Sequence, residues 1–431
     1  MQLISISVAL AAGLMMTRVF KKLRLNLPDV TAFLLAGLLI GPYGLGALGI
    51  PNVGFASYEA VEELGILSTV ALGFIAFSIG NEFRLSQLRE TGRQATVIGI
   101  IQALTATLLV DAALLGLRVF LGEDTLSTSV AITLGAIATA TAPAATLMVV
   151  RQYKARGRLT DLLLPVVALD DAVGLVVFAV SFGVAQAIGS GSVNLLSIIV
   201  EPIVEIVGSL ALGALMGLLL SLLEKLFFSN SNRLSLIIAF VLMTIALSQQ
   251  EIALPHLTLR FSSLLVCMML GTIFCNLCPR SGDMMERADK WTAPLFALFF
   301  VLSGAELELS VFRSPAVIGI GLVYILARSA GKYLGAYGSA ALTGCGDNVR
   351  KYLGITLLPQ AGVALGMCNT AAALGGYNGV LIRNIVLFGV LIYELFGPTL
   401  TRIALTRAGD IKPVEEEKKN HDRFSTPKHR R

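Results

Sequence analysis

Two adjacent aspartates, Asp170 and Asp171, lie inside the apolar segment 160–188. A charged side chain at the centre of a bilayer costs from about 3 to more than about 10 kcal/mol, so an ionisable residue there is by default a functional-site hypothesis. Consecutive residues of a helix point about 100° apart. One carboxylate can therefore reach an ion cavity while the other turns toward a neighbouring helix. The pair predicts a site that handles protons or cations.

A second charged pair, Arg328 and Lys332, stands four residues apart in the apolar segment 315–342. Residues at this spacing share one face of a helix. Lysine can release its proton in a buried site, whereas arginine stays charged. Lys332 is therefore the predicted partner of one aspartate; the alternative is that its long side chain reaches the cytoplasmic surface.

Two prolines interrupt apolar helices at corresponding positions. Pro143 follows the run TATA at 139–142, and Pro359, followed by Gln360, lies in the run LLPQAG at 357–362. Proline removes a backbone donor and clashes with the preceding turn. Broken backbone at membrane depth is tolerated where it lines a cavity or is satisfied by neighbours. A simple kink is the alternative, but two such helices indicate inverted repeats with the binding site at their crossing.

The composition requires that these motifs lie in a membrane. Hydrophobic residues make up 55% of the 431 residues, charged residues only 14%, and the mean hydropathy is +0.79. A soluble domain has about 25% charged residues. Stretches of about 17–25 apolar residues are long enough to cross a bilayer. We therefore predict an all-α polytopic membrane protein of about 13 helices with two crossing broken helices, at residues 3–20, 30–49, 64–80, 96–120, 127–150, 160–188, 195–223, 234–247, 261–277, 291–306, 315–342, 352–374 and 381–405.

Charge in the connecting loops predicts the orientation, because Lys and Arg accumulate on the cytoplasmic side. Basic residues cluster in alternate connections, at 18–24, 84–93, 151–158, 280–290 and 350–351, and the connections between them are acidic or neutral. This predicts an outer N-terminus and a cytoplasmic basic tail at 406–431, which is charge-dense and expected to be disordered. The net charge of +5 is thereby explained without a nucleic-acid partner.

Two further acidic residues, Asp111 and Glu394, lie in apolar segments away from these motifs. Either residue could relay protons, pair with a polar neighbour or lie at a subunit interface. Both are secondary candidates, together with Arg328, Pro359 and Gln360.

The motifs, in their order and spacing, resemble the monovalent cation:proton antiporter-2 family, which includes bacterial sodium/proton antiporters. The resemblance covers about residues 5–405 and is carried by TATAPAATL (139–147), LLPVVALDDAVGL (163–175), PLFALFFVLSGAELEL (294–309) and ARSAGKYLGA (327–336). It implies that Asp171 binds the monovalent cation and the proton in competition and that Asp170 pairs with Lys332. Thr139 and Thr141 would border the ion site.

The family also implies an architecture and a setting. A transporter domain at 1–405 would contain core ion-transport helices at about 96–190 and 291–405, moving against the remaining helices, which form a dimerisation scaffold. The protein would be a homodimer in the lipid bilayer of the bacterial inner membrane, without a cofactor. It would exchange Na⁺, or Li⁺ or K⁺, for protons by alternating access. An Asp-Asp pair with a lysine resembles the electrogenic subgroup.

One departure from the family concerns the second proline. Some relatives have an Arg-Gly-Glu run after it, whereas this chain has Gln360, Ala361 and Gly362, so an acidic group is missing there and the choice of cation is open. A sodium-coupled symporter of an organic solute is the alternative function. An aspartyl protease is disfavoured, because its two carboxylates must share a proton and normally come from separate helices.

Overall fold

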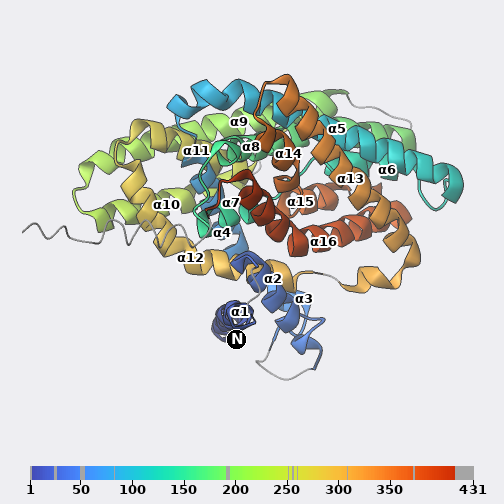
Figure 1. The fold of residues 1–431 in the computed structure, drawn as a ribbon, viewed down its shortest axis with the longest axis horizontal. Coiled ribbons are helices and arrows are strands. Elements are labelled where there is room, and N and C mark those ends of the chain that lie inside the picture. Colours follow the sequence, from blue (N-terminus) through green and yellow to red (C-terminus); the bar gives the residue numbers. More distant parts are fainter. Residues whose placement is uncertain are drawn as a thin grey trace, which may run out of the picture.

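The computed structural model describes residues 2–23, 27–48, 54–81, 83–190, 195–250, 252–254, 257–259, 261–307, 309–371 and 374–412. Helices dominate the described chain (Figure 1). Their bounds are α1 Gln2–Lys22, α2 Asp29–Ile40, α3 Tyr58–Glu62, α4 Gly65–Asn81, α5 Leu85–Leu121, α6 Thr128–Ile137, α7 Pro143–Gln152, α8 Arg158–Ser190, α9 Leu195–Leu223, α10 Asn230–Ser248, α11 Ser263–Leu277, α12 Ser281–Ala305, α13 Pro315–Leu342, α14 Asp347–Thr356, α15 Gly362–Ala371 and α16 Gly376–Ala408. Short 3₁₀ turns lie at Leu45–Leu48, Glu224–Leu226 and Leu309–Arg313.

Each apolar segment expected to cross the membrane contains a helix or a pair of half-helices. In the described chain, nine helical segments are long and apolar enough to cross a membrane, and three shorter apolar helices accompany them. Several helices extend beyond the apolar segments: α5 begins at Leu85 rather than at residue 96, and α12 at Ser281 rather than at 291. Hydropathy detects the lipid-facing part of a helix, whereas backbone hydrogen bonding continues into polar residues.

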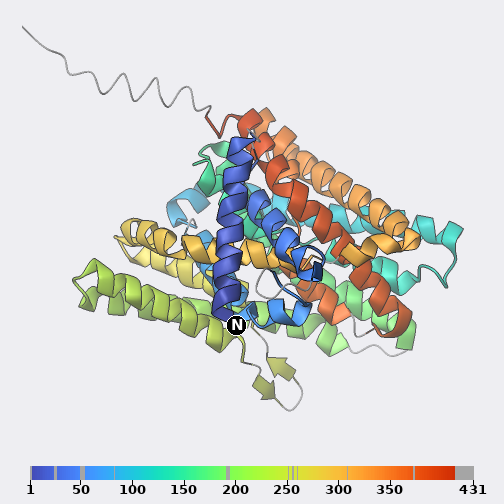
Figure 2. The same ribbon diagram turned by 90° about the horizontal axis from the view of Figure 1, so that it is seen from below.

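A short β-hairpin departs from the all-helical expectation without changing the fold class. Its strands, β1 Ile252–Leu254 and β2 Leu257–Leu259, pair antiparallel, with Leu254 opposite Leu257. The hairpin projects from the end of the molecule at which α1 begins, whereas α16 finishes at the opposite end (Figure 2). The part of the tail from residue 413 onward lies outside the described residues.

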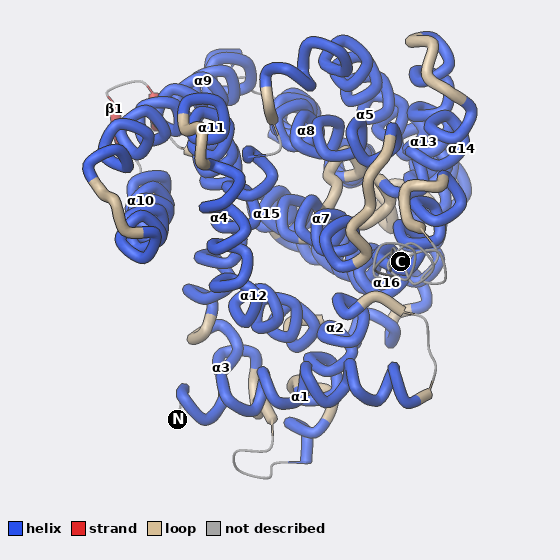
Figure 3. Tube along the Cα trace, turned by 60° about the vertical axis from the view of Figure 1, so that its left-hand side comes forward, coloured by secondary structure: helices blue, strands red, loops and turns tan. Residues whose placement is uncertain are grey.

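The helices pack in two groups. The first, which we call the α12 bundle, contains α1, α2, α4 and α9–α12; α12 packs on α1, α2 and α4, and α11 packs on α4 and α9. The second, the crossing bundle, contains α5–α8 and α13–α16. In it, α13 lies along α5 and against α14 and α16, α8 packs on α5 and α6, and α16 packs on α7 and α15. Figure 3 shows α10, α4, α12 and α1 on one side, α5, α13 and α14 on the other, and α7 between them. Residue 291, where the second core segment was expected to begin, lies inside α12.

Glycines allow α2 and α12 to pack backbone against backbone. A Cβ atom on Gly304 would lie 2.1 Å from the carbonyl oxygen of Leu34, and one on Gly37 would lie 1.9 Å from that of Val301. No side chain fits at either position without separating the helices. Small residues at such crossings are the usual means by which membrane helices approach closely.

We expect Gly304→Leu to destabilise the α12 bundle by about 1–3 kcal/mol, as overpacking does in closely packed interiors. Thermal unfolding of the detergent-purified protein measures the effect. Gly319→Leu is the matched control, because no atom lies within 4 Å of a Cβ built on that residue of α13. Equal melting temperatures for the two variants would contradict this packing argument.

Candidate ion-binding site

Two broken helices meet at the centre of the crossing bundle. The first break, residues 138–142, separates α6 from α7, and the second, residues 357–361, separates α14 from α15. Pro143 occupies the first turn of α7, where its missing N–H needs no partner. The two breaks touch directly, since the backbone N–H of Ala142 donates to the carbonyl of Pro359 at 2.8 Å. Pro359 therefore contributes to the crossing through its backbone.

Arg328 of α13 binds the backbone carbonyls that the breaks leave free. Its Nε donates to the oxygen of Ala138 at 3.0 Å, and its two terminal nitrogens donate to Ala140 at 2.6 Å and Leu358 at 2.8 Å. The side chain is fully buried, and its guanidinium lies 4.5 Å from the ring centroid of Tyr393. The planar fork of donors suits arginine to several acceptors at once. Arg328 thus ties the two half-helix ends together.

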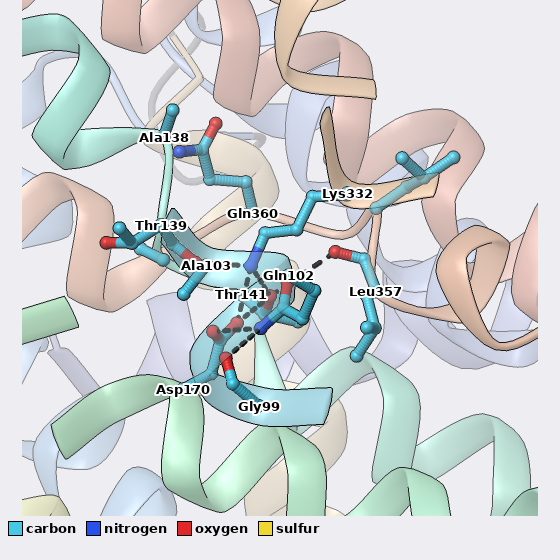
Figure 4. Close-up of polar contacts among 12 residues, drawn as sticks. Gly99, Gln102, Ala103, Ala138, Thr139, Thr141, Asp170, Lys332, Leu357 and Gln360 are labelled. Carbon is cyan, nitrogen blue, oxygen red and sulfur yellow. Dashed lines mark hydrogen bonds and ion pairs between the residues drawn. The ribbon is translucent and has the colours of Figure 1, made fainter. Parts of the chain in front are cut away.

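Lys332, one turn further along α13, points its ammonium group at the first break and at Asp170 (Figure 4). Its Nζ donates to the carbonyl of Thr139 at 2.5 Å and to Oγ1 of Thr141 at 3.0 Å. The third contact is an ion pair with Oδ2 of Asp170 at 2.6 Å. All three donors of the ammonium group therefore have partners, and the side chain is 0% exposed.

Asp170 is held on both of its oxygens. Nε2 of Gln102 donates to Oδ1 at 2.5 Å, and the hydroxyl of Thr141 donates to Oδ2. Desolvating two charges costs several kcal/mol each, which their attraction offsets only when the remaining polar groups are satisfied. Here the described partners meet that condition. Asp170 and Lys332 form a fixed, closed ion pair within the crossing.

Asp171 has a different environment. It is only 4% exposed, yet its Oδ1 has no hydrogen-bond partner in the described part of the chain. A buried polar atom without a partner requires an explanation, such as an unseen ion or water. Of the two adjacent aspartates, Asp171 is therefore the one with a buried oxygen that no described residue hydrogen-bonds.

Gln360 lies on another side of the crossing. Its Nε2 donates to the carbonyl of Ile137 at 3.0 Å, and its amide also bonds with the hydroxyl of Tyr324. It therefore caps the end of α6 rather than contacting the aspartates. The hydroxyl of Thr139 likewise donates locally, to Ala136 at 2.7 Å, so that only the Thr139 carbonyl serves Lys332.

Asp111 and Glu394 do not join this cluster. Asp111 of α5 is partly exposed, and its Oδ1 lies where a Cβ atom on Gly135 of α6 would be. Glu394 of α16 is buried and lines a separate cavity with the first residues of α7 and α15. Sequence reasoning missed Gln102 and Tyr324. A glutamine inside an apolar helix was the available signal for Gln102.

A cavity of about 590 Å³ approaches α8 from the basic connection between α7 and α8. Its lining includes Arg151, Lys154 and Asp161, and it reaches Leu164 and Pro165. Pro165 precedes Asp171 by six residues, about 9 Å along a helix. In the described residues no group of three or more His, Cys, Asp or Glu is placed to hold a metal ion.

We expect Arg328→Gln to destabilise the protein by at least about 3 kcal/mol, because it leaves buried carbonyls at both breaks without donors. Arg402→Gln is the control, since Arg402 also lies over a tyrosine ring, that of Tyr153 at 5.2 Å. Thermal unfolding in detergent compares the two. Similar losses would mean that the stacking, and not the carbonyl contacts, stabilises the crossing.

A double-mutant cycle tests the closed ion pair. Asp170→Asn and Lys332→Gln should each cost about 3–5 kcal/mol, because each leaves an uncompensated buried charge. The double variant should lose less than the sum of the single losses. Chemical or thermal unfolding of the four proteins gives the coupling free energy. Additive losses would show that the two groups do not stabilise each other.

The comparisons with known proteins agree with this architecture. The family model for the transmembrane sodium/hydrogen exchanger matches residues 6–406. The high-affinity Na⁺/H⁺ antiporter NhaS3 of Synechocystis sp. is 24% identical over 88% of this chain and 85% of its own. AmhT, an ammonium/H⁺ antiporter subunit of Alkalihalophilus pseudofirmus, is 22% identical over 88% of this chain and 90% of its own.

The fold matches that of a solved transporter. The sodium proton antiporter MjNhaP1 of Methanocaldococcus jannaschii, at pH 8, superposes with a TM-score of 0.69 at 19% identity, covering 95% of this chain and 99% of the other. The expectation of an antiporter fold is confirmed. With the family model matched over nearly the whole chain, the protein belongs to the sodium/hydrogen exchanger family of membrane transporters and is not an enzyme.

Proposed function

We propose that this protein exchanges Na⁺ for protons across the bacterial inner membrane and that Asp171 carries both ions in turn. The observation that carries the proposal is the contrast between the two aspartates. Asp170 is closed off by Lys332, Thr141 and Gln102, whereas Asp171 is buried with an oxygen lacking a partner. A desolvated carboxylate is a binding site for whichever small cation reaches it.

Competition at one carboxylate couples the two ions. A proton on Asp171 removes the charge that holds Na⁺, and bound Na⁺ blocks protonation. Each crossing of the membrane therefore carries one ion or the other, so the flux of one drives the other. Raising the pH empties the site of protons and favours Na⁺ uptake, whereas at low pH protons win and exchange stops.

The finer assignments follow from the sequence motifs. The Asp170–Asp171 pair with Lys332 favours the antiporter-2 subgroup and electrogenic exchange. We place the N-terminus outside and the C-terminus in the cytoplasm, as the loop charges indicate. The two bundles touch where α2 packs on α7 and α16, where α4 packs on α7 and where α9 packs on α8. We propose that the crossing bundle moves along this boundary while the α12 bundle, paired with a second copy, stays in place.

Asp171→Asn should abolish cation-evoked proton flux. The purified protein is reconstituted in liposomes with an internal pH dye, and Na⁺, Li⁺, K⁺ and NH₄⁺ are added in turn between about pH 6 and pH 9. The amide cannot exchange a proton in this range, so we expect loss of at least about 100-fold. Wild-type flux should rise toward alkaline pH.

Asp283→Asn is the control, because Asp283 lies in the first turn of α12, outside the site. Flux retained by Asp171→Asn would mean that another group carries the ions. A wild-type rate that stays flat across this pH range would contradict competition. If no cation evokes proton flux from the wild type, a solute-coupled symporter becomes the better reading, and Na⁺ uptake that depends on an organic solute would establish it.

A further inference from the structure

A second carboxylate, Glu394 of α16, is buried in the membrane-spanning part of the protein, and no described residue pairs with it. It is 4% exposed, and its Oε2 accepts no hydrogen bond from any described residue. None of the ion pairs in the described chain involves it. Buried carboxylates are rare in membrane helices and usually face an ion or proton pathway.

The carboxylate lines a cavity of about 160 Å³ at the boundary between the two bundles. One wall consists of the first residues of α7 and α15 with the residues just before them. The opposite wall is apolar and comes from α4, α11 and α12. The lining residues that carry the argument are Ala142, Pro143, Gly362, Leu264, Phe299 and Phe300. Since a single water needs about 10–15 Å³ of such volume, the cavity has room for a cation with several waters.

The two half-helix starts make this cavity suitable for an ionised carboxylate. Each helix N-terminus carries a positive partial charge and unpaired N–H groups. These dipoles lower the cost of ionising Glu394 but do not neutralise it. A mobile cation can therefore still bind.

Among the residues that the structure describes, the charged groups around Glu394 supply no counter-ion for it. Glu306, the residue that follows α12, lies within electrostatic reach of Glu394 and of Glu62 of α3, and all three are acidic. On α13, Arg328 stacks on the neighbouring Tyr393, but it donates to the backbone carbonyls of the two breaks. The cation that balances an ionised Glu394 must come from the cavity.

We propose that Glu394 is a second cation-binding carboxylate of the transporter, which takes up a proton or a monovalent cation from the cavity at the starts of α7 and α15. This inference rests on the proposed exchange function. Besides Asp171, the transporter would then have a second titrating carboxylate, located where the crossing bundle meets the α12 bundle.

The test measures how the apparent KM for Na⁺ depends on pH in proteoliposomes. Wild type, Glu394→Gln, Glu394→Asp and the exposed control Glu286→Gln are compared. With two competing carboxylates, log KM should fall with pH with a slope between about one and two, and Glu394→Gln should reduce it to about one. We also expect KM to rise about tenfold in Glu394→Gln, with Glu394→Asp restoring most of the wild-type behaviour.

The outcomes separate this inference from the exchange function itself. Absence of cation-evoked flux in the wild type would overturn the function. An active wild type, with Glu394→Gln unchanged in KM and in pH slope, would overturn only the role of Glu394. A Glu394→Gln variant with a lower maximal rate, but unchanged KM and slope, would identify Glu394 as structural and likewise overturn the inference.

Discussion

The structure depends on how the broken ends of α6 and α14 are neutralised. Both half-helices end within apolar membrane segments, where the carbonyls at a helix end need partners from outside the helix. Arg328 and Lys332, on one face of α13, donate to carbonyls of the breaks: Arg328 to both breaks and Lys332 to Thr139 of the first. Without two cations at this point, the free carbonyls and the negative ends of the half-helices would have to be buried unsatisfied. The crossing of the two broken helices therefore depends on α13 lying beside it.

That arrangement also assigns different tasks to two adjacent aspartates. Lys332 brings a positive charge into the crossing, and Asp170 balances it at 2.6 Å. Because the next residue of α8 points about 100° away, Asp171 cannot share the same partners. Its free oxygen is thus a geometric consequence of pairing its neighbour. Under the proposed exchange, this pair would keep a constant background charge beside Asp171, so that the net charge at Asp171 would change only with the ion bound there.

The sequence predicted the parts that obey local rules. Hydropathy located the apolar helices, the two prolines located the breaks, and the rarity of charge in such helices marked Asp170, Asp171 and Lys332. It did not reveal that Arg328 binds carbonyls of both breaks, because those acceptors come from residues 138–140 and 358 and meet only in the fold. Gln102 was missed for the same reason: its role appears only when α5 packs against α8. The starts of α5 at Leu85 and of α12 at Ser281 were predicted too late in the sequence, because backbone hydrogen bonds continue through polar residues that hydropathy does not count.

The crossing has two faces, and their electrostatics are opposite. Carbonyls of the two breaks accept hydrogen bonds from Arg328 and Lys332 on one face. The starts of α7 and α15, which carry positive partial charges, border the cavity that Glu394 lines. This opposition follows from two broken helices that cross in antiparallel orientation. Each break places the C-terminal end of one half-helix and the N-terminal end of the next at the crossing. The negative C-terminal ends favour cationic side chains, which α13 supplies as Arg328 and Lys332. The positive N-terminal ends favour a carboxylate, which α16 supplies as Glu394. The second face adjoins α4, α11 and α12. A change of charge at Glu394 would therefore act at the boundary between the two bundles, along which the proposed movement takes place.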